Sequence, residues 1–229
     1  MKHLARSNLS DQLARILGSR IIKNELKSGE ILHETKISKQ WGVSRSPVRD
    51  ALHMLVQYRL LEKTTSGSYK VTEMTRDYIL NFYDTANIIY QYAFAKAAEN
   101  ATKNDIRELK AALDKIEESL ETNNFGIYVE GVTECGKIVL RIAGNPIVEK
   151  IAMELMPTAE RVQYSTLSIL PNYLETMVAF VRKGYQHITE GNPQQAAQDF
   201  ADFAEVHKQI NLDNISPKKA SDPVLRGTK

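Results

Sequence analysis

The stretch of residues 37–61 constrains the fold of this chain more than any other part of the sequence. It predicts a short helix over residues 35–41, a turn at Gly42 and Val43, and a second helix that begins after Ser44. The apolar residues of the second helix recur at helical spacing, at Val48, Leu52, Leu55 and Val56. This arrangement is typical of a helix-turn-helix, whose second helix can enter a groove of DNA.

The N-terminal end of this second helix has the residue types that contact DNA. Ser44 is suited to cap a helix N-terminus, and Pro47 is tolerated in a first turn because its missing N–H would have no partner there. Arg45, Ser46 and Arg49 cluster at the same end, away from the apolar residues. A recognition helix enters the major groove by this end, and arginine suits bidentate contact with guanine. The alternative is two solvated arginines on an ordinary surface helix.

A hairpin follows the second helix. Residues 61–63 and 68–72 read as two short strands, with a turn between them that ends at Gly67. Gly67 supplies the permissive backbone that a hairpin tip needs, and the basic residues Lys63 and Lys70 suit a wing that lies along phosphates. Helices and hairpin together predict a winged helix-turn-helix.

The charge of the chain is unevenly distributed. Residues 1–75 carry 13 Lys and Arg against 7 Asp and Glu, a net charge of +6, and the remaining residues carry 17 against 21, a net charge of −4. A positive balance steers a domain towards phosphates without choosing a sequence. A solvated lysine-rich face would give the same count, so the charge supports the prediction of DNA binding without carrying it.

Two further properties of the sequence bear on the compartment. The single cysteine, Cys135, excludes an intramolecular disulfide and reads as a small buried hydrophobe. No apolar run approaches the roughly 20 residues of a membrane-spanning helix. We therefore expect a cytoplasmic protein with no membrane contact.

Helical periodicity dominates the rest of the chain. Residues 7–27 predict a helix that packs against the winged helix. Beyond residue 76 the pattern predicts a bundle of about six helices, over residues 77–100, 104–122, 125–143, 146–168, 173–190 and 193–212. Asn104 is the expected cap of the second of these. The predicted fold class is mainly α, with a winged helix-turn-helix at 1–75, an all-α helical bundle at 76–215 and a flexible tail at 216–229.

Several of these motifs, in order, resemble the DNA-binding domain of the GntR family of bacterial transcription regulators. The matching segments are residues 29–32, 37–38, 41–52 and 67–71. An arginine that many relatives use in the first helix of the motif falls at Thr35, next to Lys36. The resemblance implies double-stranded DNA operator contact by Ser44, Arg45, Ser46, Pro47, Arg49 and Gly67, to which we add Lys36.

The helical part resembles the FadR-like branch of that family, which has an FCD-type C-terminal domain, and residues 141–146 are similar to a helix junction of that branch. The resemblance implies a homodimer on a palindromic operator, acting as a repressor that responds to a small molecule, usually an organic or sugar acid. Two other readings stay open. One is a constitutive DNA-binding protein whose helical domain only dimerises. The other is a small helical enzyme, for which the sequence offers no nucleophile elbow and no phosphate-binding glycine-rich loop.

Many relatives hold a divalent metal in this bundle through an Asp and three His. The resemblance places those ligand positions on Val132 and Gly136, in a segment with Cys135, and on Val181 and Phe203. The side chains at the ligand positions cannot bind a metal, so we predict no metal and no other cofactor. An alternative metal site stays open, made of His187, His207 and Glu134.

Four polar residues are predicted to contact the effector. Asn87 takes the place of an arginine that often meets the effector carboxylate in relatives. Arg161 lies among apolar residues of its helix, where an inward-facing guanidinium would need an anionic partner. Tyr164 and Arg182 complete the set. The alternative for Arg161 is an ion pair at the surface. Three tyrosines are expected either in the wall of the effector pocket or in the core of the bundle: Tyr83, Tyr90 and Tyr128.

Overall fold

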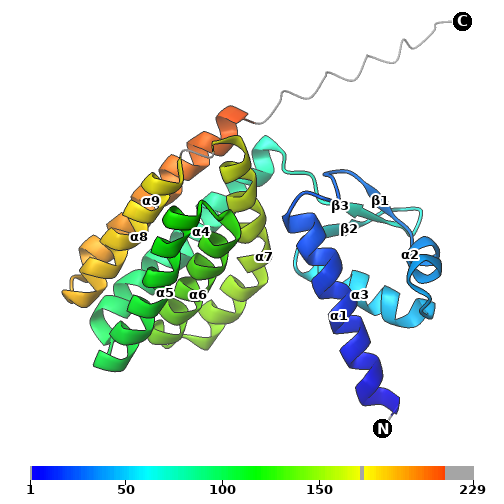
Figure 1. Ribbon diagram of the computed structural model, residues 1–229, viewed down its shortest axis with the longest axis horizontal. Helices are drawn as coiled ribbons and strands as arrows, with labels where there is room; N and C mark the ends of the chain where they lie inside the picture. Colours follow the sequence, from blue (N-terminus) through cyan, green and yellow to red (C-terminus); the bar gives the residue numbers. More distant parts are fainter. Residues whose placement is uncertain (1, 171–172, 215–229) are drawn as a thin grey trace, which may run out of the picture.

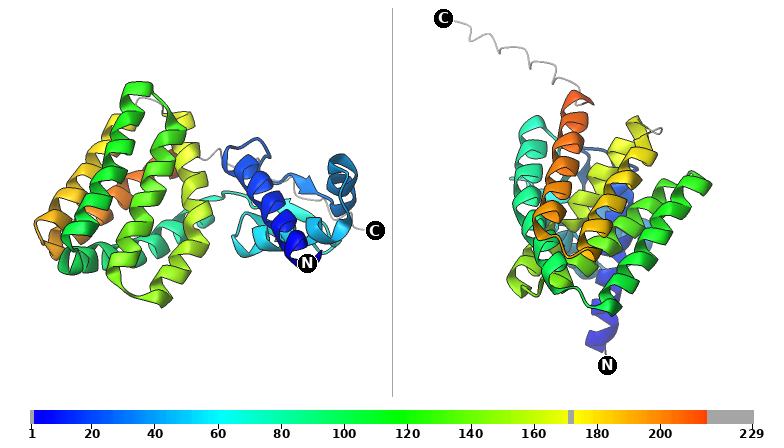
Figure 2. Two further views of the ribbon diagram at one scale, coloured as in Figure 1. Left: turned by 60° about the horizontal axis from the view of Figure 1, so that its bottom comes forward. Right: turned by 90° about the vertical axis from the view of Figure 1, so that its left-hand side faces the viewer.

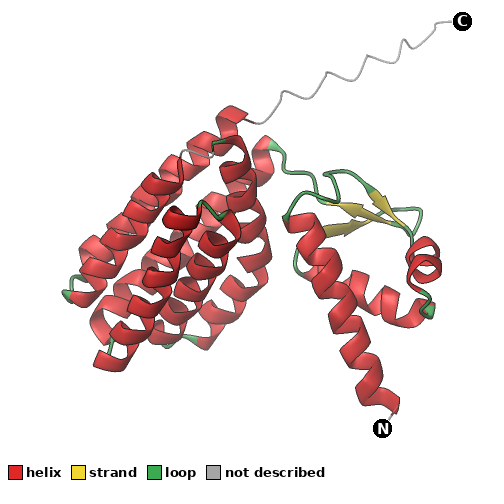
Figure 3. Ribbon diagram, in the orientation of Figure 1, coloured by secondary structure: helices red, strands yellow, loops and turns green. Residues whose placement is uncertain are grey.

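The computed structural model describes residues 2–170 and 173–214, and its elements are labelled in Figure 1. Within these residues it has nine helices and three short strands. A winged helix and a helical bundle lie side by side in two different views (Figures 1 and 2). All three strands belong to the winged helix (Figure 3). The predicted fold class is confirmed. The predicted tail at 216–229 lies outside the described residues, and the division at residues 75 and 76 stays a prediction.

The winged helix has the predicted order of elements and one strand more. Its elements are α1 (Lys2–Ile22), β1 (Ile31–Leu32), α2 (Glu34–Trp41), α3 (Arg45–Gln57), β2 (Leu61–Lys63) and β3 (Tyr69–Val71). The sheet has the order β1-β3-β2 and is antiparallel throughout. Helix α1 ends earlier than the predicted residue 27, and Asn24 takes a left-handed φ of 57° just beyond it. Strand β1 was not predicted.

The turn between α2 and α3 is held by backbone and side-chain bonds. Gly42 has a φ of 64°, a left-handed conformation that glycine adopts without steric cost. The Ser38 hydroxyl donates to the Val43 carbonyl at 2.6 Å. These contacts set the angle at which α3 leaves the turn. Helix α3 then packs its buried face, which includes Val48, Leu52 and Leu55, into the same core as α1.

The bundle contains the six predicted helices. They are α4 (Arg76–Asn100), α5 (Lys103–Thr122), α6 (Phe125–Ala143), α7 (Pro146–Ile169), α8 (Leu174–Thr189) and α9 (Pro193–Asn214). The predicted cap Asn104 is wrong: α5 begins after Thr102, whose side chain and that of Asp105 cap each other's backbone N–H. Within the described residues, no helix is long and apolar enough to cross a membrane.

Helix α5 lies close against α6 at Gly131. A Cβ atom added there would lie 2.6 Å from Ile116 Cγ1 and 3.3 Å from the Ile116 backbone nitrogen. We expect Gly131→Ala to lower the free energy of unfolding by about 1–3 kcal/mol, because this contact cannot relax without separating the helices. Urea unfolding measures the change. The matched control is Gly136→Ala on the same helix, where the nearest atom is 3.6 Å away, and it should not destabilise the protein. Equal effects at both positions would contradict the prediction.

Candidate DNA-binding surface and ligand cavity

The N-terminal end of α3 presents the two arginines to solvent. The side chains of Arg45 and Arg49 are 62% and 52% exposed. Ser44 occupies the N-cap position, with an extended backbone but no side-chain cap bond, so its hydroxyl is not used in holding the helix. Ser46 is half-buried and Pro47 is buried, which gives Pro47 a role in packing the helix start. The structure thus gathers exposed cations and a hydroxyl at the end by which a recognition helix enters a groove.

A single carboxylate lies between the two arginines. Arg45 Nη2 is 3.4 Å from Glu34 Oε2, and Arg49 Nε is 4.0 Å from Glu34 Oε1. Burial and the nearby Glu34 carboxylate raise the pKa of Tyr69. Sequence reasoning missed Glu34, although an acid immediately before the predicted helix of residues 35–41 was a readable signal for a partner. Glu34 accepts a hydrogen bond from Arg45 and lies at the outer limit of an ion pair with Arg49.

The remaining predicted contacts lie on neighbouring elements. Lys36 is exposed on α2, and Gly67 is exposed at the wing tip with a φ of 82°. Of the two basic residues on the wing, Lys63 is exposed. Lys70 instead lies 3.4 Å from Glu62 and 3.3 Å from Glu73, so that two carboxylates offset its charge. Lys63 is therefore the better placed of the two for a phosphate.

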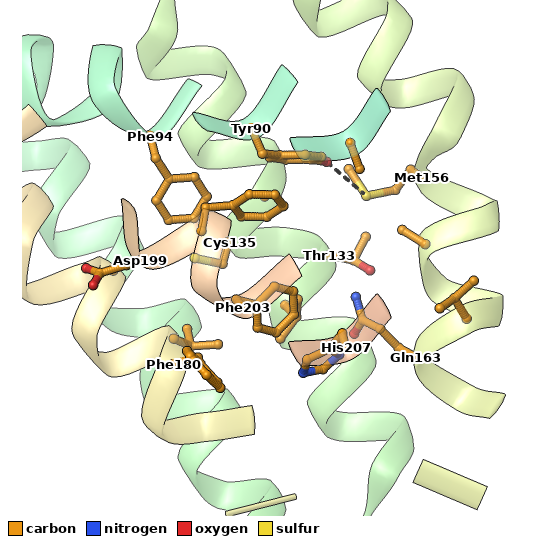
Figure 4. Close-up of a pocket in the computed structure, with 18 of the residues that line it drawn as sticks. Tyr90, Phe94, Thr133, Cys135, Met156, Gln163, Phe180, Asp199, Phe203 and His207 are labelled. Atoms are coloured by element: carbon orange, nitrogen blue, oxygen red, sulfur yellow. Dashed lines mark hydrogen bonds between the residues drawn. The ribbon is translucent and has the colours of Figure 1, made fainter. Parts of the chain in front are cut away.

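The helical bundle encloses a cavity of about 120 Å³ (Figure 4). Its lining comes mainly from α4, α6, α7, α8 and α9 and is largely apolar, with several aromatic rings. The rings include Phe82, Tyr90, Phe94, Phe180, Phe200 and Phe203. Tyr83 and Tyr90 line the cavity, whereas Tyr128 lies in the core of the bundle. Burial raises the pKa of the Cys135 thiol, at the cavity wall, to about 12, so the sulfur stays protonated at neutral pH.

Two buried polar atoms of the cavity lining have no hydrogen-bond partner among the described residues. They are Nε2 of His207 and Oε1 of Gln163. His207 is 1% exposed, and burial lowers its pKa to about 3, so the imidazole is neutral at pH 7. Figure 4 shows both side chains at the same end of the cavity, below Thr133. A third polar residue, Asp199, is hydrogen-bonded to His187 Nδ1.

The alternative metal site is wrong. Among the described residues, no three His, Cys, Asp or Glu side chains gather where they could hold a metal ion. His187 is bonded to Asp199, whereas the His207 ring packs on Phe203 with 4.0 Å between centroids. Glu134 lines a separate cleft between α1 and the bundle. The positions that the resemblance assigned to the metal-binding region do meet, however: Val132, Cys135, Gly136, Val181 and Phe203 all line the cavity.

The four predicted effector residues lie elsewhere. Asn87 accepts a hydrogen bond from Gln91 on the same helix at 2.9 Å. Tyr164 lines the cleft between α1 and the bundle. The exposed Arg182 donates from Nε to Glu117 at 2.6 Å. The structure places none of the four, Arg161 included, in the lining of the cavity.

Arg161 joins the two parts of the molecule. It is a residue of α7, 4% exposed, and its guanidinium donates to the Thr72 carbonyl at 2.8 Å and to the Ser28 hydroxyl at 2.9 Å. Thr72 follows β3 and Ser28 precedes β1, so both acceptors belong to the winged helix. Burial lowers the pKa of Arg161. We call this pair of bonds the Arg161 link.

Two family models match the chain. The model described as "Bacterial regulatory proteins, gntR family" matches residues 9–71, and the model described as "FCD domain" matches residues 82–203. The first therefore covers the winged helix from α1 to β3, and the second covers most of the bundle.

Two curated relatives share a name. The chain is 31% identical over 166 residues to the gluconate operon transcriptional repressor of Bacillus subtilis (strain 168), a match that covers 69% of this chain and 65% of that protein. It is 30% identical over 122 residues to the protein of the same name from Bacillus licheniformis, covering 53% of this chain and 48% of that one. The match thus spans less than two thirds of the length of either relative.

A solved structure is similar over nearly the whole chain. It is described as E. coli McbR/YncC, with a TM-score of 0.78 at 19% identity, and the match covers 91% of this chain and 99% of that one. At this identity the likeness concerns the arrangement of the winged helix and the bundle.

Proposed function

The chain belongs to the gntR family of bacterial regulatory proteins and has an FCD domain, and we propose on this basis that it is a transcription regulator that binds an operator through its winged helix. The observation that carries the proposal is the pair of exposed arginines, Arg45 and Arg49, at the N-terminal end of α3. Arginine in this position reads guanine through its O6 and N7 acceptors. Lys36, Ser44, Ser46 and the wing tip at Gly67 supply backbone contacts that position the helix.

We also propose that a small molecule in the cavity regulates operator binding. The support comes from α7, which contributes Val162 and Gln163 to the cavity lining and Arg161 to the link with the winged helix. A ligand that shifts α7 changes the position of both link acceptors. By thermodynamic necessity the operator then changes the affinity for the ligand by the same factor. The relatives named as repressors favour repression as the sign of regulation.

An exposed apolar patch supports assembly of two copies. Ile88 and Tyr92 of α4 and Ile147 and Ile151 of α7 form this patch, and Ile88 and Ile147 are 74% and 71% exposed. Asn145 Nδ2 donates to the Tyr92 hydroxyl at 3.3 Å, which places the start of α7 beside this part of α4. A second copy is the occupant that we propose, because a palindromic operator needs two recognition helices in one assembly.

The double variant Ile88→Asp with Ile147→Asp is therefore expected to be monomeric. Each isoleucine contributes about 1.5–3 kcal/mol when it is fully buried, and an aspartate at the same place would have to lose its hydration. Sedimentation velocity of the full chain measures the assembly state. The matched control is Ile16→Asp at an exposed residue of α1, which should leave assembly unchanged. A double variant that still forms dimers would contradict this choice of surface.

The regulator proposal is tested by selecting fragments of the source genome that the protein binds. The best fragment is then titrated at several fixed salt concentrations, beside random DNA of the same length, because affinities depend steeply on salt. We expect a palindromic site with a clear preference over random DNA. Selection that yields no site would overturn the proposal. A site whose affinity responds to no small molecule would favour constitutive binding, with a bundle that only dimerises.

A further inference from the structure

The walls of the cavity exclude a charged ligand. None of the described residues that line it is lysine or arginine. Its imidazole, His207, is neutral, and its carboxylate, Asp199, is already bonded to His187. A carboxylate or phosphate buried here would lose its hydration with no cation in compensation, which is strongly unfavourable. This lining therefore argues against the organic or sugar acids that the family resemblance implies.

The size of the cavity sets the size of the ligand. A cavity of about 120 Å³ is close to the roughly 150 Å³ at which an apolar cavity takes up benzene. The rings of Tyr90, Phe94 and Phe203 stand in its walls (Figure 4), and Phe200 also lines it. Tyr90 and Phe200 are stacked on each other with 5.0 Å between centroids. Such walls favour a flat ring that packs against them edge-on or offset.

The two polar atoms without partners indicate which hydrogen-bonding group the ligand has. Buried polar groups in native proteins are nearly always hydrogen-bonded, and an unsatisfied one costs stability. Gln163 Oε1 can only accept a hydrogen bond, and neutral His207 offers one donor or one acceptor at Nε2. A hydroxyl satisfies both atoms, since it donates and accepts, and an N–H group satisfies the amide oxygen.

We propose that the cavity binds a neutral molecule of about the size of one aromatic ring, with a hydroxyl that bonds to both Gln163 and His207 or an N–H group that bonds to Gln163. The inference deepens the proposed ligand response and rests on it for any effect on DNA. The ring packs among the aromatic side chains of α4 and α9, and the polar group lies at the end of the cavity near α7. A bond to Gln163 reaches the helix that also carries the Arg161 link.

Calorimetric titration of the full chain with three probes at pH 7 tests the inference. Phenol has the ring and the hydroxyl, toluene has the ring alone, and benzoate has the ring with a negative charge. We expect phenol to bind about tenfold more tightly than toluene, and benzoate to give no saturable heat. Benzoate binding as tightly as phenol would overturn the neutral-ligand assignment. No binding by phenol or toluene at millimolar concentration would overturn the site itself.

Two variants locate the binding. Gln163→Met keeps the length of the side chain and removes Oε1. The affinity for phenol should therefore fall about tenfold, while the affinity for toluene should stay within twofold of the wild type. Gly136→Leu places side-chain atoms between Tyr90 and Met156, which lie 3.6 and 3.8 Å from an added Cβ, and should abolish binding of both probes. Circular dichroism checks that each variant is folded. Unchanged phenol affinity in a folded Gln163→Met variant would overturn the assignment of the polar end.

The outcome is separable from that of the proposed function. Phenol binding in a protein for which fragment selection yields no operator would support the cavity assignment and refute the regulator. A clear operator with no binding of phenol or toluene would support the regulator and refute the cavity assignment.

Discussion

Arg45→Ala and Arg49→Ala are each expected to weaken binding to the selected operator by about 1–3 kcal/mol, which is roughly 5- to 150-fold in affinity. Both side chains are exposed at the N-terminal end of α3 and do not pack in the core. Their loss should therefore leave thermal stability and assembly unchanged. Because both arginines face Glu34, the double variant is expected to depart from the sum of the single effects. Fluorescence anisotropy of labelled operator at fixed salt measures each affinity.

A control variant distinguishes sequence-specific contact with bases from the general loss of one positive charge. Lys110→Ala removes one positive charge from α5 of the bundle, where the lysine pairs with Asp114, and should change operator affinity by less than twofold. Random DNA of the same length is titrated beside the operator. If the arginine variants lose as much affinity for random DNA as for the operator, they contact phosphates and sequence is read elsewhere.

The second large effect is expected at the Arg161 link. Arg161→Ala removes both bonds and leaves the buried Thr72 carbonyl without this donor. Hydrogen bonds from a charged group are each worth about 1.5–3 kcal/mol. Burial of an arginine offsets part of that gain, so we expect the winged helix to lose about 2–4 kcal/mol of stability and not the full sum.

The sequence provides a probe for each part of the molecule. Trp41, its one tryptophan, lies in α2 of the winged helix, whereas helical circular dichroism comes mainly from the bundle. We expect both signals to follow one urea transition in the wild type. In Arg161→Ala the fluorescence transition should move to lower urea while the dichroism transition stays. Arg182→Ala removes an exposed ion pair with Glu117. It should change the free energy of unfolding, followed by either signal, by no more than about 1 kcal/mol. Coincident transitions in Arg161→Ala would contradict the link.

Most of the fold could be predicted because its signals are local. The turn at Gly42, the breaks at Gly144 and Gly191, and the apolar periodicity of the bundle helices all act within a few residues of where they stand. Strand β1 has no such signal. It consists of Ile31 and Leu32 and exists because Leu32 pairs with Tyr69 of β3, a contact that depends on the folded hairpin. The cap of α5 was misplaced because Thr102 and Asn104 are both good capping residues.

The candidate site was predictable in part. The arginines of α3 lie where the helix-turn-helix pattern put them. The cavity lies where the family resemblance suggested a metal, but its polar residues were missed, because helical spacing does not tell which neighbour a side chain meets. Arg161 was the clearest case. Its position among apolar residues indicated burial, and its partners Thr72 and Ser28 lie in the other part of the chain. Gln163, two residues further on, faces the cavity instead.

The carboxylate of Glu34 bears on how quickly such a protein finds its target. A recognition helix with two free guanidiniums would adhere to any stretch of phosphates and release counterions wherever it landed. Here the arginines lie 3.4 and 4.0 Å from Glu34 and would have to leave it to contact DNA. A guanine edge with two acceptors would compensate that loss better than a single phosphate oxygen. In a protein that binds its operator through these arginines, the pairing would shorten the residence time on random DNA and so speed the search for a correct site.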